Sequence, residues 1–112
     1  MVNKSIIVII LSCIGFSAYA GTTYTNEELN RLVESGAPPK EMPEQVDKIK
    51  PVPFPTCKLA INNIYKKVHG EYPVEITGNG TDTYAIKVWT YDGVAMTKCI
   101  DGNRILSGAE YE

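Results

Sequence analysis

The cysteines of this 112-residue chain constrain its fold more than any other feature. Cys13 lies in an N-terminal apolar run typical of a secretory leader, so export removes it. The remaining pair, Cys57 and Cys99, is an even number of cysteines in an oxidising compartment, which predicts a structural disulfide. In the chain-entropy model a loop of about 43 residues contributes roughly 4 kcal/mol. The alternative is a reactive thiol at Cys57, but the chain has no Cys-x-x-Cys motif.

The first 20 residues have the layout of a signal peptide. Lys4 precedes an apolar run from Ile6 to Phe16, and Ala18-Tyr19-Ala20 resembles a signal-peptidase site. We therefore expect cleavage after Ala20 and a periplasmic or secreted mature protein. The run is shorter than the ~20 residues that span a bilayer, so no membrane span is expected after cleavage. Lipid attachment at Cys13 is the alternative, although the preceding Leu-Ser fits a lipoprotein site only loosely.

The charge of the mature chain argues against nucleic acid as a partner. Removal of Lys4 leaves ten basic residues against 13 acidic residues, a net charge near −3. Binding to nucleic acid requires a clustered basic face, which this balance does not favour. A chain of this length can form one small domain with a limited core.

Residues 21–55 are predicted to form a short helix and a proline-rich arm. Thr25 and Glu28 fit a capping box, and Gly36 can end a helix whose apolar stripe follows the cap. The segment Ala37–Pro55 carries six prolines, which prevent regular helix and central strand and favour a stiff connector. A proline-rich ligand for an aromatic groove is the alternative. The apolar stripe consists of Leu29, Leu32 and Val33.

Residues 56–112 are predicted to form a small disulfide-stapled domain. Thr56 can cap a helix over CKLAINNIYKKVH that Gly70 ends. Beyond it, YPVEIT, TYAIKVWTY, VAMTKCI and ILSGA are rich in strand-forming residues, and GNGTD, DG and DGN separate them. The fold class is therefore α+β, with one helix packed on a small antiparallel meander of three to four strands. The short helix and the proline-rich arm precede it.

The register of the central hairpin predicts which side chains share a face. A two-residue Asp92-Gly93 turn would place Tyr91 opposite Val94 and Ile86 opposite Cys99. Cys99 must face the helix that carries Cys57, so Trp89 lies on the far side of the sheet. The same register pairs Trp89 with Met96, Lys87 with Lys98 and, across the GNGTD loop, Ile76 with Tyr84 and Val74 with Ile86.

The far side of the predicted sheet is a candidate surface for binding a partner. Aromatic and apolar patches of this kind usually mark interaction sites, and Trp and Tyr are enriched in binding hot spots. The alternative is that the N-terminal helix covers Trp89. Opposed lysines are mildly destabilising, which calls for an acidic neighbour, either Glu75 or a group on a partner. The candidate partner-binding residues are Trp89, Tyr91, Val94, Met96, Lys87 and Lys98.

The sequence nominates no catalytic or metal-binding constellation and no cofactor. His69, the only histidine, sits where it complements a helix C-terminus, and no nucleophile is placed beside it. We therefore expect a non-enzymatic protein that binds another envelope or periplasmic protein. Its role would be an inhibitor or immunity factor, or an accessory component of an envelope secretion or conjugation system. A small cell-wall-acting hydrolase using His69 is the alternative, and the far face could also form a homodimer.

Overall fold

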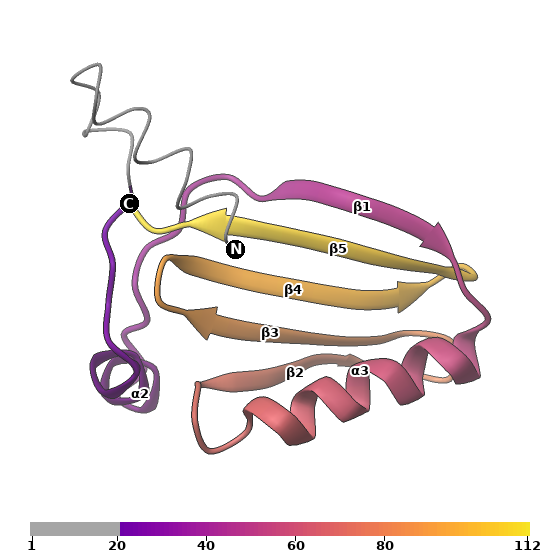
Figure 1. Cartoon of the computed structure of the whole chain (residues 1–112), viewed down its shortest axis with the longest axis horizontal. Helices are drawn as coiled ribbons and strands as arrows, with labels where there is room; N and C mark the ends of the chain where they lie inside the picture. Colours follow the sequence, from indigo (N-terminus) through magenta and orange to yellow (C-terminus); the bar gives the residue numbers. More distant parts are fainter. Residues whose placement is uncertain (1–20) are drawn as a thin grey trace.

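The computed structural model describes residues 21–112, so the signal peptide and Cys13 lie outside the described residues. In residues 21–112, two helices accompany one five-stranded antiparallel sheet with strand order β1-β5-β4-β3-β2 (Figure 1). The α+β class is confirmed, but the described sheet has five strands rather than three to four. The elements are α2 (Asn26–Glu34), β1 (Gln45–Pro51), α3 (Phe54–Val68), β2 (Val74–Asn79), β3 (Tyr84–Thr90), β4 (Gly93–Ile100) and β5 (Asn103–Glu110).

The capping box predicted for the first helix is confirmed at α2. The Glu28 N–H donates to Thr25 Oγ1 at 3.2 Å, and Glu28 Oε1 accepts from the Thr25 N–H at 2.9 Å. This hydrogen bond favours the ionised carboxylate and lowers the pKa of Glu28. Gly36 follows the helix with φ 80°, a conformation that glycine adopts at little cost.

The additional strand, β1, comes from the proline-rich arm. Residues 45–51, which the sequence predicts as part of a connector, pair antiparallel with β5 at one edge of the sheet. Proline is tolerated there because an edge strand leaves part of its backbone unpaired, and Pro51 is the last residue of β1. The register shifts between Val46 and Lys48, which breaks the alternation that would have identified a strand in the sequence.

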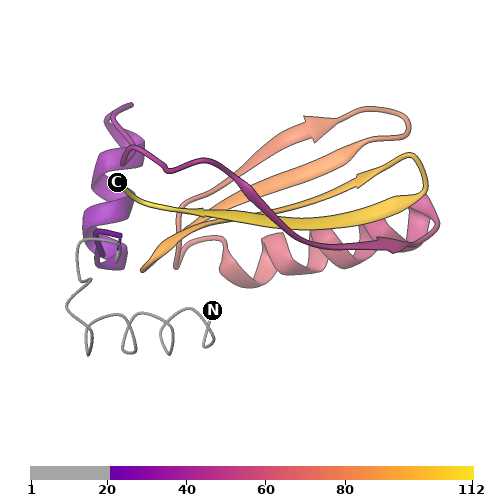
Figure 2. The ribbon, with the colours of Figure 1, turned by 90° about the horizontal axis from the view of Figure 1, so that it is seen from above.

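The second helix, α3, begins earlier than the sequence predicts. Its cap is Pro53 rather than Thr56, and Pro55 occupies the first turn, where its missing N–H costs nothing. The helix ends at Val68, just before Gly70, as expected. One face of α3 packs on one face of the sheet, which we call the helix face (Figure 2). The buried residues of this core are Cys57, Ile61, Tyr84, Ile86, Val88 and Cys99.

The predicted disulfide is confirmed. Cys57 on α3 and Cys99 on β4 are bonded, with Cα atoms 5.9 Å apart and a sequence separation of 42. Both residues are fully or almost fully buried. The bond therefore lies inside the core and joins the helix directly to the middle of the sheet.

The predicted hairpin register is wrong by two residues, although the predicted faces are right. Trp89 pairs with Val94, and Tyr91 and Asp92 form the loop, because Gly93 belongs to β4. A Cβ at position 93 would collide with the Ala109 carbonyl of β5, so glycine is required inside the strand. Lys87 therefore lies opposite Met96, and Lys98 opposite Ala85.

A register shift of two residues leaves every side chain on the face predicted for it, because side chains alternate between faces with a period of two. The β2–β3 pairs differ from the prediction in the same way. Ile76 lies opposite Ile86, and Val74 opposite Val88, with an irregularity after Ile76. At the next hairpin the turn is Asp101-Gly102, whose φ values of 51° and 74° are those of a type I′ turn.

Loss of the disulfide should strongly destabilise the protein. Replacing both Cys57 and Cys99 by Ala should lower the free energy of unfolding by about 4 kcal/mol, because the unfolded chain regains its loop entropy. Urea denaturation followed by circular dichroism measures this difference. Wild-type protein reduced with dithiothreitol should unfold near the same midpoint as the double variant, and an unchanged midpoint in the variant would contradict a stabilising role.

Candidate interaction surfaces

Helix α2 lies at one end of the sheet (Figure 1). It packs on part of the sheet face opposite to α3, which we call the opposite face. Leu29 of α2 is fully buried against Trp89, Val94 and Ala109, and Tyr111 completes the cluster. The apolar stripe that the sequence predicts for this helix is therefore partly used to cover the sheet. Tyr24, Val33 and Met96 are partly buried around the cluster.

The predicted partner-binding residues are divided by this arrangement. The sequence leaves open whether α2 covers Trp89, and in the structure it does. Trp89 is 4% exposed and Val94 is 1% exposed. Tyr91 lies in the β3–β4 loop and is 59% exposed. Lys87, Met96 and Lys98 are partly buried on the same face as Trp89, farther along the sheet.

Lys87 has an acidic neighbour, but not the one that the sequence suggests. Glu75 lies opposite it on β2, whereas its Nζ is 2.5 Å from Glu41 Oε2 in the arm. The same ammonium group lies 5.0 Å from the ring centroid of Trp89, within the range of a cation–π contact. Lys87 therefore ties the arm to the covered end of the opposite face.

Tyr111, the penultimate residue, links this cluster to the β3–β4 hairpin. Its hydroxyl donates to the Thr90 carbonyl at 2.7 Å and also lies 3.2 Å from the Gly93 carbonyl. Its ring meets that of Tyr24 edge to face, with centroids 5.1 Å apart. Burial, together with the charges of Glu41 and Asp92, raises the pKa of the Tyr111 phenol. The sequence offers no signal for this role.

The half of the opposite face away from α2 exposes aliphatic side chains. Ile49 lies opposite Ile105, which lies opposite Lys98, so the three form one row across β1, β5 and β4. Val46, opposite Ser107, lies on the same face in the next row. Val46 is 58% exposed and Ile49 is 60% exposed, while Ile105 and Lys98 are partly buried. We call Val46, Ile49, Lys98 and Ile105 the open patch.

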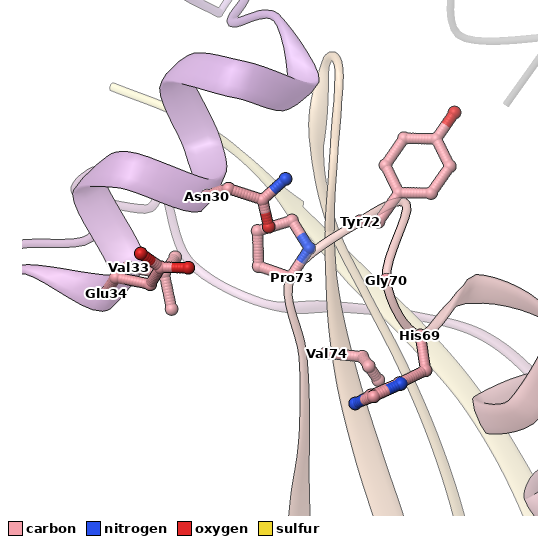
Figure 3. A pocket seen from close by; sticks show the side chains of 8 residues that line it. All are labelled: Asn30, Val33, Glu34, His69, Gly70, Tyr72, Pro73 and Val74. Atoms are coloured by element: carbon pink, nitrogen blue, oxygen red, sulfur yellow. The ribbon is translucent and has the colours of Figure 1, made fainter.

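A cavity of about 490 Å³ separates α2 from the turn that follows α3 (Figure 3). It brings the carboxylate of Glu34 and the imidazole of His69 into one lining, with Pro73 between them (Figure 3). The His69 ring stacks on that of Tyr65, with centroids 5.2 Å apart. No Ser, Thr or Cys lines this cavity, so its lining offers a carboxylate and an imidazole but no aliphatic hydroxyl and no thiol.

Within residues 21–112, no three His, Cys, Asp or Glu side chains are grouped closely enough to hold a metal ion. The same part of the chain contains no helix that is long and apolar enough to cross a membrane. Comparison with known proteins finds no matching family model, no matching curated protein and no matching solved structure.

Trp89 should report the docking of α2, because it is the only tryptophan in the chain. Leu29→Ala leaves a cavity beneath α2 and should destabilise its packing by about 3 kcal/mol, shifting the fluorescence of Trp89 to the red as water reaches the indole. Leu32→Ala, in the same helix but outside both buried clusters, is the matched control and should leave the emission unchanged. Equal shifts in the two variants would contradict the described packing.

Tyr111 should ionise at a higher pH than an ordinary phenol, because burial raises its pKa. Its folded-state pKa lies above the unfolded value, so this group stabilises the fold fully below about pH 10 and loses that contribution at higher pH. Absorbance at about 295 nm, the usual phenolate wavelength, should show a late component that Tyr111→Phe removes. Tyr91→Phe, at an exposed position, is the matched control and should leave the late component unchanged. A late component that persists in the Tyr111 variant would refute this assignment.

Proposed function

We propose that this protein is exported to the periplasm or secreted, and that it works there as a non-enzymatic module that binds another envelope protein. The signal-peptide layout of residues 1–20 supports export, and the Cys57–Cys99 disulfide is compatible with an oxidising compartment. The inhibitor or immunity role, and the accessory role in an envelope secretion or conjugation system, both require such a binding surface.

The observation that carries this proposal is the open patch. Val46 and Ile49 are more than half exposed side by side on β1, with Ile105 and Lys98 continuing the surface inward. Aliphatic surface gathered in this way costs free energy in water and is stabilised when a partner covers it. Of the partner-binding residues predicted from the sequence, Lys98 belongs to the proposed contact, and Met96 and Lys87 lie at its border. Trp89 and Val94 are buried beneath α2 and are not part of this contact.

The partner should contact the face of the sheet rather than extend it. The β1 edge carries Lys48, Lys50, Pro51 and the irregularity at Asp47, and these are devices that prevent another strand from pairing with an edge. Side-chain packing on the open patch therefore supplies the affinity, and Lys98 favours an acidic group at the centre of the contact.

Site-specific photo-crosslinking in the producing cell tests this proposal. A photoreactive side chain at Ile49 should give one discrete adduct with another protein, whereas the same group at Leu59 should not. Leu59 is the matched control because it is equally apolar and 63% exposed, but lies on α3. Adding Lys98→Glu should reduce the adduct at position 49 by roughly tenfold, since a reversed charge at the contact costs more than about 1.4 kcal/mol.

Two outcomes would overturn the proposal. Equal labelling at the two positions would mean that the open patch has no preferred partner. An adduct of twice the mass of this chain would identify the patch as a homodimer interface instead, the self-association that the sequence leaves open.

A small cell-wall-acting hydrolase is the second candidate, because Glu34 and His69 line the same cavity. A water molecule could then serve as nucleophile, with one of these groups acting as general base. Purified protein should then clear a suspension of peptidoglycan, and both His69→Ala and Glu34→Gln should abolish the clearing. Protein that leaves the suspension turbid would eliminate this candidate.

A further inference from the structure

On the helix face, α3 leaves part of the sheet uncovered beside β5 and β1. A groove of about 240 Å³ lies there, with Ile64 of α3 on one side and Val88, Ala95 and Leu106 among the side chains that line it. Asp47, at the irregularity of β1, and Arg104 are its charged lining residues. The groove is therefore mostly apolar, with one acidic and one basic side chain in its lining.

A second hollow of about 120 Å³ adjoins this groove and is basic. It is lined by Lys48, Lys50, Arg104 and Leu106. Lys50 lies directly opposite Arg104, and Lys48 opposite Leu106, so all four side chains lie on the helix face. Like charges directly opposed across two strands destabilise the sheet, and a basic hollow of this kind is stabilised when an anion enters it.

In residues 21–112, Lys48, Lys50 and Arg104 form no ion pair with a carboxylate. The ion pair found there joins Lys87 and Glu41 on the opposite face. Arg104 is held in place because its Nε donates to Thr97 Oγ1 at 3.4 Å, and Thr97 is buried. Arg104 and Leu106 line both hollows, so the basic one continues into the aliphatic one.

We propose that this composite groove binds an acidic peptide segment of another protein. A carboxylate of the segment lies among Lys48, Lys50 and Arg104, and a neighbouring aliphatic side chain of the segment packs over Val88 and Leu106. Arg104 can bind a carboxylate with two parallel hydrogen bonds, while the two lysines contribute point charges. Asp47 repels a carboxylate from the aliphatic end and so fixes the direction of the segment.

The groove excludes other occupants on chemical grounds. Three cations on a chain with an acidic balance are too few for the phosphate backbone of a nucleic acid. The acidic C-terminal segment of the chain cannot serve, since Tyr111 is fully buried and the Glu112 N–H donates to the Lys40 carbonyl. This site lies on the face opposite to the open patch, so it does not depend on the function proposed above.

Titration of ¹⁵N-labelled protein with the peptide acetyl-Leu-Glu-Asp-Glu tests the proposal by NMR. Amide signals of β1 and β5 around Lys50 and Arg104 should shift, and the affinity should fall as salt is raised from about 0.05 M to about 0.5 M. Lys50→Gln and Arg104→Gln should each weaken binding by roughly tenfold, because each removes a charge-assisted hydrogen bond. Lys50 is exposed, so its variant remains informative even if Arg104→Gln impairs folding.

Lys66→Gln is the matched control, since Lys66 is an exposed lysine in the last turn of α3 outside the groove, and it should not change the affinity. The amidated peptide with Gln and Asn in place of its acids should not bind. Equal binding of the charged and neutral peptides, or equal loss in the Lys50 and Lys66 variants, would overturn the proposal. Decanoate that binds where the peptide does not would overturn it too, because the groove would then accept an aliphatic acid rather than a peptide segment.

Discussion

The bond between Cys57 and Cys99 determines how the rest of the molecule is arranged. It fixes α3 to the middle strand of the sheet, so one face of β3 and β4 must be the core. The side chains that alternate with Cys99 along β4, those of Val94, Met96 and Lys98, are thereby directed away from α3. The aromatic cluster under α2, the open patch and the basic groove all occupy positions that follow from this one choice of face.

Local patterns in the sequence determine part of this fold. The capping box at Thr25, the helix that carries Cys57 and the side of the sheet on which Trp89 lies could all be predicted, because each depends on local spacing or on alternation. The hairpin register could not. It depends on Gly93 meeting Ala109 on β5, a contact between segments that sequence patterns do not connect.

The candidate surfaces were less accessible to prediction, for a related reason. Lys98 and Met96 were placed on the correct face by alternation, but β1 was not predicted, and β1 supplies Val46, Ile49, Lys48 and Lys50. A bulged edge strand among prolines has neither alternation nor a typical composition. The sequence also could not decide whether α2 covers Trp89, because helix and sheet each had an apolar stripe in need of a partner. That question is settled by tertiary packing alone.

The two ends of the described chain meet beside α2. Thr22 Oγ1 donates to the Glu112 carbonyl at 2.8 Å, and Gly21 lies against the backbone of Tyr111, where a Cβ would collide with the carbonyl oxygen. The first and last described residues are thus close enough in space to be joined. A short peptide could join its ends and new ends could be opened in the exposed loop at residues 80–82, giving a circular permutant in which the strand order, the disulfide and both surfaces are retained.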